Sequence, residues 1–335
     1  MPVNISKYLT MKIGGTAFDL RRLREKEDIV KLVNKSRGSG LPIFILGSGS
    51  NTIFRDSYHP IIIGKMEIKG ISIESSRGKK TLVRIGAGED WDNLVKWAVN
   101  KNLQGIEALS GIPGTAGAAP IQNIGAYGSE LADSLEPVEA YDIKKSRFVK
   151  MVNKECGFSY RDSVFKKNPG RWIISAVVLR LSKGSPAIIP NYKDVTQYFE
   201  SKKIKSPSTK EIRKAILEIR SFKLPDPKQI PNCGSFFKNP VLKKSAVKKL
   251  KSEYPDLIAF PFGKDKLKVS AGWLIDKAGF KGYREGGLGV YKNNALVLIN
   301  QGKGSFKDLN NLRKKIKERV WNMFGIRLEE EVNII

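Results

Sequence analysis

The sequence predicts an α+β fold, and three features of the chain support this prediction. Apolar runs at residues 41–46 and 61–63 flank a short polar loop and read as buried strands. Apolar side chains recur at helical spacing from Trp91 to Ala98, directly after Asp90, a residue type that caps helices. Further strands are expected at residues 71–74, 81–85 and 172–181.

Two more helices are predicted toward the C-terminus. Ser208 and Glu211 resemble a capping box, and an apolar stripe follows them at helical spacing. A long amphipathic helix is expected over residues 306–324, capped by Ser305 and ended by Gly325.

The chain is large enough for two or three domains. It has 335 residues, 41% of them hydrophobic, and can bury a substantial core without disulfides. Residues 223–228 contain two prolines and break regular structure, so a domain boundary is expected there. The last residues, 326–335, read as a strand.

Cysteine and histidine usage excludes several kinds of site. Cys156 and Cys233 lie far apart and form no CxxC pair, so neither a disulfide framework nor a zinc site is predicted, and a reducing, cytoplasmic compartment is expected. The single histidine, His59, excludes multi-histidine metal sites, and it is expected in a turn without a function. No secretion signal or membrane span is recognisable.

The formal charge of +27 allows two interpretations. Clustered lysines and arginines bind polyanions such as nucleic acid by releasing counterions. Lysine-rich segments such as residues 243–251 are also typical of a solvated helix face. We favour the solvated face and expect no nucleic-acid partner.

Two glycine-rich segments indicate a phosphate-bearing cofactor. Gly47, Ser48, Gly49, Ser50 and Asn51 offer consecutive backbone N–H groups with little side-chain bulk, as a pyrophosphate requires. The segment lacks the third glycine of a dinucleotide-binding fingerprint, and an ordinary turn between strands is the alternative. Residues 109–128 contain five glycines, two prolines and almost no charge, which suits backbone packed closely against a ligand.

These segments, with others in the same order along nearly the whole chain, resemble the UDP-N-acetylenolpyruvoylglucosamine reductase family of bacterial cell-wall synthesis. The other matching segments are residues 12–16, 86–88, 160–166, 223–227, 234–240, 271–276 and 328–332. The resemblance implies a two-subdomain FAD-binding fold of the PCMH/vanillyl-alcohol-oxidase type, plus a C-terminal α+β substrate-binding domain. The expected division is residues 1–70, 71–222 and 223–325, with the terminal strand 326–335 returning to the first subdomain.

The resemblance also implies a noncovalent FAD, with NADPH as the hydride donor. Besides the loop of residues 47–51, the residues implied near FAD are Ile112, Pro113, Gly114, Gln122, Asn123, Gly125, Ala126 and Tyr127. Ala118 and Ala119 stand where some family members carry serines, so a hydroxyl contact from those two positions is not expected.

Three catalytic roles follow from the implied reaction, in which hydride from flavin N5 adds to C3 of the enolpyruvyl group. Negative charge then develops on the carboxylate, and the guanidinium of Arg161 is expected to hold it. Glu331 is expected to share a hydrogen bond with the carboxylate while protonated or nearly so, and Ser235 to give a proton to C2. Arg161 as a surface ion-pair partner, Ser235 as a turn residue, and Glu329 or Glu330 in place of Glu331 are the alternatives.

Cations are needed for the nucleotide-sugar diphosphate, and Tyr192, Lys223, Lys238 and Asn239 match family positions near substrate. The expected partners are therefore a UDP-sugar enolpyruvyl ether and NADPH, without membrane or metal, and a monomer is expected. Two other functions are weighed: an FAD oxidase that passes electrons to oxygen, and a basic nucleic-acid-binding protein.

Overall fold

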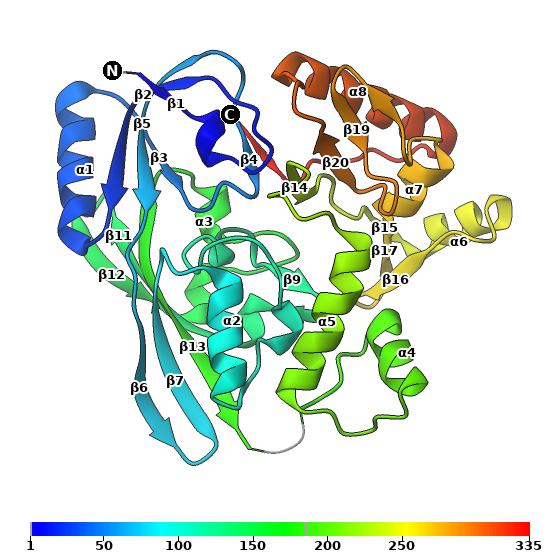
Figure 1. Cartoon of the computed structure of the whole chain (residues 1–335), viewed down its shortest axis with the longest axis horizontal. Coiled ribbons are helices and arrows are strands. Elements are labelled where there is room, and N and C mark those ends of the chain that lie inside the picture. The colour runs from blue at the N-terminus through cyan, green and yellow to red at the C-terminus, as the bar shows by residue number, and fades with distance from the viewer. Residues whose placement is uncertain (1, 185–186) are drawn as a thin grey trace. The chain divides into compact units, whose positions relative to one another are not determined.

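The computed structural model describes residues 2–184 and 187–335 (Figure 1). Its internal contacts divide the chain into two compact units. The first comprises the residues up to Val3 with Ala17–Ser48 and His59–Ser221. The second comprises Asn4–Thr16, Gly49–Tyr58 and Phe222–Ile335. The chain therefore passes from one unit to the other inside the glycine-rich loop of residues 47–51.

A four-stranded sheet in the first unit carries this loop. Its order is β1-β2-β5-β3, formed by β1 (Val3–Asn4), β2 (Thr16–Leu23), β5 (Tyr58–Met66) and β3 (Ile43–Leu46). Strands β3 and β5 run parallel, with Leu46 opposite Lys65. Ligands in open α/β sheets bind beyond the carboxyl ends of parallel strands, and Gly47 directly follows β3. Helix α1 (Lys26–Ser39) packs near β3.

A larger antiparallel sheet supports the second glycine-rich segment. Its order is β12-β11-β13-β7-β6, with β8 paired to β13, and the strands are β6 (Ile71–Arg77), β7 (Lys80–Gly86), β8 (Leu103–Gln104), β11 (Leu135–Asp142), β12 (Arg147–Met151) and β13 (Trp172–Lys183). Helix α2 (Trp91–Asn100) begins at Asp90, whose carboxylate accepts from the Asn93 N–H at 2.9 Å. One hydrophobic core joins Ile62, Val83 and Leu94, so both sheets and α2 pack together.

The remaining elements of the first unit are short, apart from one helix. They are η2 (Glu107–Leu109), η3 (Ala119–Gln122), β9 (Gly125–Ala126), β10 (Ser129–Glu130), η4 (Leu131–Asp133), η5 (Asn153–Cys156), α3 (Val164–Lys167), α4 (Lys193–Ser201) and α5 (Thr209–Lys223). Helices α4 and α5 share a small core that includes Val195, Phe199 and Ile216.

The second unit has its own sheets, helices and core. Its main sheet has the order β14-β20-β19-β18, from β14 (Asn232–Ser235), β20 (Val297–Asn300), β19 (Leu288–Val290) and β18 (Arg284–Glu285). A second sheet joins β15 (Val241–Lys243), β17 (Lys266–Val269) and β16 (Ala259–Phe262), and the helices are α6 (Lys244–Glu253), α7 (Ala271–Lys277) and α8 (Phe306–Phe324). The N-terminal segment η1 (Ser6–Tyr8) also belongs to this unit. Strand β4 (Thr52–Ile53) pairs in parallel with β21 (Asn333–Ile334).

Most predicted elements are confirmed, and two predictions are wrong. Helix α8 has the predicted bounds, with Ser305 as cap and Gly325 in the left-handed conformation at its end. The terminal strand is shorter than predicted and covers only Asn333–Ile334. His59 lies in strand β5 and not in a turn; it is buried between exposed Tyr58 and Pro60, as the alternation of a strand requires.

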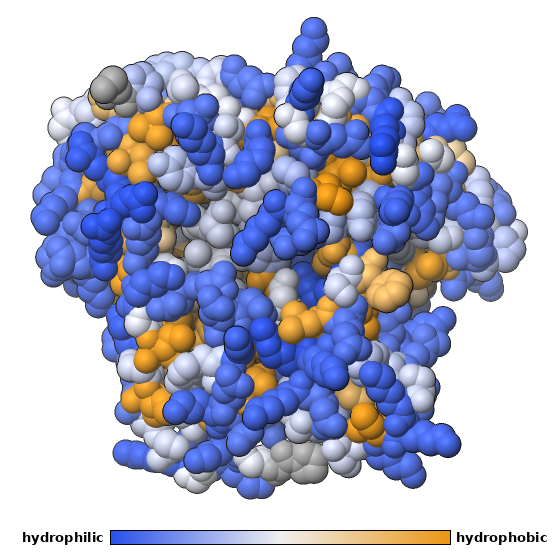
Figure 2. Space-filling view, in the orientation of Figure 1, coloured by the Kyte–Doolittle hydropathy of each residue, from blue (hydrophilic) through white to orange (hydrophobic). Residues whose placement is uncertain are grey.

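The three-part division at residues 70 and 222 remains a prediction. Residues 1–70 contribute to both units, since Met11, Ile13 and Ile53 belong to the core of the second. None of the helices within the described ranges is long and apolar enough to cross a membrane. Hydrophilic side chains cover most of the face shown in Figure 2, and α6 buries only Val247, as predicted for a solvated lysine-rich helix.

Candidate functional site

The loop of residues 47–51 requires glycine at two positions. A Cβ atom at Gly47 would lie 2.7 Å from the Thr115 hydroxyl oxygen. Gly49 has φ of +73°, and a Cβ there would lie 2.1 Å from the Tyr8 carbonyl oxygen. The backbone of this loop is therefore held closely against its surroundings, which leaves it without side-chain bulk where a phosphate group would approach.

The segment that follows η2 contains a polar atom without a partner. The Thr115 hydroxyl is buried and accepts or donates no hydrogen bond within the part of the chain that the structure describes. Buried hydroxyls are nearly always bonded, so this atom indicates a missing ligand. Ile112, Pro113, Gly114, Gln122 and Ala126 lie in the same segment and are half-buried or exposed. The residues present therefore fit a bound FAD.

Asn123 has its side chain committed to the protein. Its amide nitrogen donates to Glu130 Oε2 at 2.7 Å, and its side-chain oxygen accepts from the Ala132 N–H at 3.0 Å. These bonds hold Asn123 in the left-handed conformation, with φ of +45°. They leave its backbone as the part that could face a cofactor.

Tyr127 is held by an aromatic and a cationic neighbour. Its ring packs edge-on against Tyr192, with centroids 5.2 Å apart, and the positive charge of Arg220 acts on its hydroxyl. Burial raises the pKa of Tyr127, and Arg220 opposes that rise. Two of the predicted site residues, Tyr127 and Tyr192, are thus in contact.

Arg161 occupies a strained position in a tight hairpin. Its φ is +55°, a left-handed conformation that is costly for a side chain with a Cβ, and such strain clusters at functional sites. The guanidinium Nη2 donates to the Gly125 carbonyl at 2.7 Å, and the Ser163 hydroxyl donates to the Ile121 carbonyl at 2.6 Å. The structure therefore brings Arg161 to the predicted FAD segment.

The segments that carry Ser235 and Glu331 are paired in the second unit. The Lys238 N–H donates to the Glu329 carbonyl, and the Glu331 N–H donates to the Phe236 carbonyl, at 2.9 and 2.8 Å. Phe236 and Phe237 are fully buried and anchor this pairing. Ser235 ends strand β14, one residue before Phe236, so Glu331 is bonded beside it.

Asn51 joins the same part of the second unit. Its side-chain nitrogen donates to the Glu331 carbonyl at 3.3 Å, and its own carbonyl accepts from the Asn333 N–H at 3.0 Å. The end of the first glycine-rich loop is therefore bonded to the chain segment that carries Glu331.

Glu330 and Glu329, the two residues before Glu331, both have ion-pair partners. The Glu330 carboxylate accepts from Arg313 Nη1 at 2.7 Å and from Lys317 Nζ at 3.0 Å, and these cations lower its pKa despite its burial. Glu329 is mostly exposed and pairs with Lys238 at 3.3 Å. Both neighbours of Glu331 thus have ion-pair partners on the protein surface or on α8.

Of the remaining substrate candidates, Asn239 is bonded to the backbone and Lys223 is exposed to solvent. The Asn239 side-chain oxygen accepts from the Ala271 N–H at 2.9 Å, at the start of α7. Lys223 is exposed and is the last residue of α5.

Comparison with known proteins decides the family. A reductase of Pseudomonas aeruginosa named UDP-N-acetylenolpyruvoylglucosamine reductase is 39% identical over 99% of this chain and 97% of its own. One of the same name from Polynucleobacter asymbioticus is 43% identical over 92% of this chain and 88% of its own. The chain belongs to the UDP-N-acetylenolpyruvoylglucosamine reductase family.

Domain and structure matches agree with the family. The model for the C-terminal domain of UDP-N-acetylenolpyruvoylglucosamine reductase matches residues 226–335, and an FAD-binding domain model matches residues 20–151. The crystal structure of UDP-N-acetylenolpyruvylglucosamine reductase from Thermus caldophilus superposes with a TM-score of 0.70 and 25% identity, over 100% of this chain and 98% of that chain. The predicted FAD-binding fold with a C-terminal α+β domain is confirmed, and this reductase is an FAD-dependent oxidoreductase.

Two residues of this reductase that lie next to predicted ones were missed by sequence reasoning. Arg220 lies beside Tyr127, and Lys65 donates to the Gly47 carbonyl. No local motif marks them, because each is brought into place by packing between segments that are distant in sequence. Thr115, which lies against Gly47, falls within the glycine-rich segment of residues 109–128, although it was not named as a candidate.

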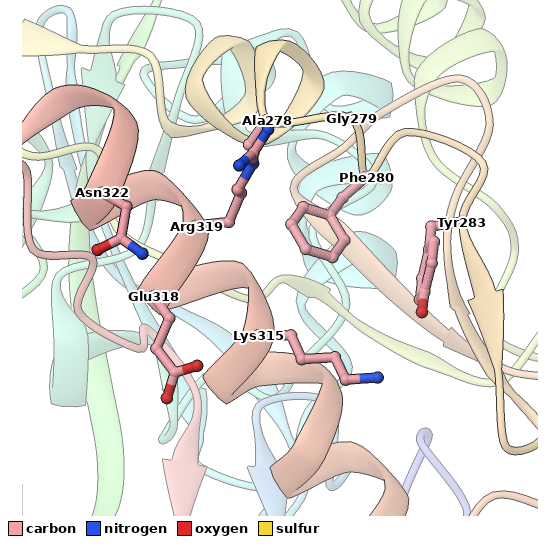
Figure 3. A pocket seen from close by; sticks show the side chains of 8 residues that line it. All are labelled: Ala278, Gly279, Phe280, Tyr283, Lys315, Glu318, Arg319 and Asn322. Atoms are coloured by element: carbon pink, nitrogen blue, oxygen red, sulfur yellow. The ribbon is translucent and has the colours of Figure 1, made fainter.

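Two other features of the reductase lie outside the predicted site. Burial raises the pKa of the Cys156 and Cys233 thiols to about 12, which makes both poor nucleophiles. A surface depression of about 440 Å³ lies between α8 and the turn after α7, where Phe280 and Tyr283 face Lys315 and Arg319 (Figure 3). None of the residues that line it is a predicted site residue. Within the described ranges, no group of three or more acidic, cysteine or histidine side chains is placed to hold a metal.

Proposed function

We propose that this reductase converts UDP-N-acetylglucosamine enolpyruvate to UDP-N-acetylmuramate for peptidoglycan synthesis, with NADPH as the source of hydride. The observation that carries the proposal is the pairing of residues 236–238 with residues 329–331, which bonds Glu331 to the residue that follows Ser235 in a chain of this family. A proton donor and a carboxyl group on paired segments suit protonation next to a substrate carboxylate.

A bound FAD, held by the loop of residues 47–51 and the segment that follows η2, would relay hydride from NADPH to C3 of the enolpyruvyl group. The protein must then stabilise the charge that develops on the substrate carboxylate. Arg161 serves this purpose, because a guanidinium stays charged and its fork matches two carboxylate oxygens. The strained backbone and the bond to the Gly125 carbonyl support this role, since they fix the guanidinium before substrate arrives.

Glu331 and Ser235 complete the chemistry on the protein side. In its protonated form, the Glu331 carboxyl donates a hydrogen bond to the carboxylate oxygen on which charge accumulates. The Ser235 hydroxyl gives its proton to C2. Phe236 and Phe237 keep this region dry, which strengthens each of these hydrogen bonds.

The nucleotide-sugar diphosphate is bound by side chains that solvent can reach. Lys238 pairs with an exposed carboxylate, and such a weak surface ion pair is readily exchanged for a diphosphate. Lys223 adds a second exposed cation, Asn239 a polar contact, and Tyr192 an aromatic surface that Tyr127 supports.

The reductase acts on small molecules, and we propose that it does so as a cytoplasmic monomer. Two buried cysteines that form no disulfide suit a reducing compartment. The charge of +27 lies on solvated faces such as that of α6, and nucleic acid is not a partner.

Replacing Ser235 by alanine tests the proton-donor role. Reduction of the flavin by NADPH should stay near its wild-type rate, because that half-reaction needs no proton at C2. Reoxidation by the enolpyruvyl substrate should slow by about 100-fold or more, the usual effect of removing a general acid. Ser252→Ala, on the exposed face of α6, is the control for both rates. Wild-type reoxidation in Ser235→Ala would remove Ser235 from the mechanism.

A further inference from the structure

Lys65 lies beside the glycine-rich loop, at the carboxyl end of β5. The parallel pairing of β3 and β5 sets Lys65 opposite Leu46, the residue before Gly47. Its ammonium group donates a hydrogen bond to the Gly47 carbonyl oxygen. The register of the sheet therefore fixes a cation at the start of the loop.

This ammonium group has one acceptor and no counter-ion. Lys65 is half-buried and forms no ion pair with any carboxylate in residues 2–184 or 187–335. Glu67, the acidic side chain with the strongest influence on it, is already paired with Arg22 at 2.7 Å. Burial lowers the pKa of Lys65, and the nearby positive charges of Arg22 and Lys69 act in the same direction. A half-buried cation without a counter-ion is costly, so an anion at this position would be bound favourably.

The hydroxyl of Thr115 is a second polar group at the same glycine, and it lacks a hydrogen-bond partner among the described residues. Its hydroxyl oxygen would lie 2.7 Å from a Cβ at Gly47, and it is the buried hydroxyl without a hydrogen-bond partner described above. Thr115 is 8% exposed, so solvent cannot easily satisfy it. A hydroxyl can donate to a phosphate oxygen, as can an ammonium group. The Lys65 ammonium and the Thr115 hydroxyl both lie against Gly47, and neither has an anionic oxygen as its partner in the part of the chain that the structure describes.

We propose that Lys65 and Thr115 form, with the Gly47 backbone, a cation-and-hydroxyl site that binds the diphosphate of FAD. Lys65 supplies the positive charge and Thr115 a directed hydrogen bond. The site lies wholly within the first unit and needs no residue of the second. The inference rests on FAD binding and is independent of the roles of Arg161, Ser235 and Glu331.

Binding of three probes to the FAD-free full-length protein tests the site. FAD and ADP carry the diphosphate and riboflavin does not, so their dissociation constants separate diphosphate from ring contacts. Lys65→Met should raise the dissociation constants of FAD and ADP by about tenfold or more, as expected for loss of a charged hydrogen bond. The dissociation constant of riboflavin should stay unchanged. The FAD affinity of Lys65→Met should also depend less on salt concentration than that of the wild type. Thr115→Val, which keeps the side-chain shape, should raise the dissociation constants of FAD and ADP by a smaller factor.

Two further variants control for charge and for folding. Lys80→Met removes an exposed lysine of the same unit and should leave all three constants unchanged. Lys65→Arg keeps the charge and should restore most of the ADP affinity. The unfolding temperature of FAD-free Lys65→Met should equal or exceed that of the wild type, since an unpaired charge is removed, whereas the rise caused by added FAD should shrink.

Unchanged FAD and ADP affinities in Lys65→Met would overturn the proposal. So would an equal loss of riboflavin affinity, since the residue would then support the fold and not the diphosphate. If the wild-type protein bound ADP and riboflavin but did not reduce the enolpyruvyl substrate, the proposed function would fail and this site would stand.

Discussion

Glu329 and Glu330, the two residues before Glu331, have ion-pair partners of different kinds. Glu330 is bound by two cations of α8 and Glu329 reaches solvent, whereas the backbone of Glu331 is bonded beside Ser235. Alternation along an extended segment places Glu330 on the opposite side from Glu329 and Glu331. The ion pairs of Glu330 indicate a structural role, and we propose Glu331 as the carboxyl group that takes part in the chemistry.

A pair of matched substitutions tests this separation. Glu331→Gln should slow flavin reoxidation by substrate by about 100-fold or more and leave the free energy of unfolding nearly unchanged. Glu330→Gln should do the reverse, because it leaves Arg313 and Lys317 without their counter-ion, at a cost of about 1–3 kcal/mol. Stopped-flow flavin absorbance and urea unfolding measure the two effects. An exchange of these results between the two variants would assign the chemistry to Glu330.

Residue types and motif order predicted most of the candidate residues, but not the bonds between them. Arg161, Tyr127 and Gly47 could be proposed from the sequence because they lie in recognisable segments. The bond between Glu331 and the residue after Ser235 arises from pairing between residues 236–238 and 329–331, which no local pattern encodes. For the same reason, Lys65 was not predicted: its role depends on the parallel register of two strands.

At the scale of single elements, α8 shows how far local signals reach. Ser305 accepts from the Asp308 N–H and Asp308 accepts from the Ser305 N–H, a complete capping box, and Gly325 ends the helix. Leu309, Leu312 and Ile316 recur at helical spacing and are buried in the core of the second unit. Cap, stripe and terminator all agree, so the sequence predicted both ends of this helix.

The cap of α8 can be tested separately from its packing. Ser305→Ala removes the acceptor for the Asp308 N–H and should lower the free energy of unfolding by about 1 kcal/mol. Ser245→Ala, at an exposed position within α6, should change that free energy by less than about 0.5 kcal/mol. Urea unfolding at constant FAD concentration measures both. An effect of Ser305→Ala as small as that of the control would show that the capping bond does not stabilise the helix.

Helix α1 was not predicted, although its signals are present. Glu25 and Asp28 form a capping box, Gly40 ends the helix, and Ile29, Leu32 and Val33 are buried. Its buried stripe is narrow and most of its other residues are polar, so its apolar periodicity is weak. Packing against β3 provides the stability that local propensity does not show.

At the scale of the whole molecule, Glu139 links charge to stability. Its side chain is 8% exposed on β11, and it accepts from Arg84 at 2.8 Å and from Lys26 at 3.1 Å. The hydrogen bonds from Arg84 are the main cause that lowers the pKa of Glu139 from 4.5 to about 2. Because the folded-state pKa is lowered, the stabilisation is present above about pH 4.5 and is lost as the pH falls toward 2.

Glu139→Gln should lower the free energy of unfolding at pH 7 by about 1–2 kcal/mol, a value reduced by the solvent exposure of Lys26 and Lys150. The difference between wild type and variant should shrink as the pH is lowered from 4.5. Glu136→Gln, which breaks an exposed pair with Arg180, should cost less than about 0.5 kcal/mol at every pH. A difference for Glu139→Gln that stayed constant down to the lowest pH at which the protein folds would contradict this account.

An anaerobic titration shows whether this chain acts as a flavin reductase of the enolpyruvyl nucleotide sugar. The purified protein with FAD is reduced by NADPH while its flavin absorbance is followed, and UDP-N-acetylglucosamine enolpyruvate is then added without oxygen. We predict that the absorbance is lost with NADPH and returns fully, one equivalent of substrate per flavin. Recovery of the absorbance only after air is admitted would indicate an oxidase. A protein that bound no FAD could not be a flavin reductase.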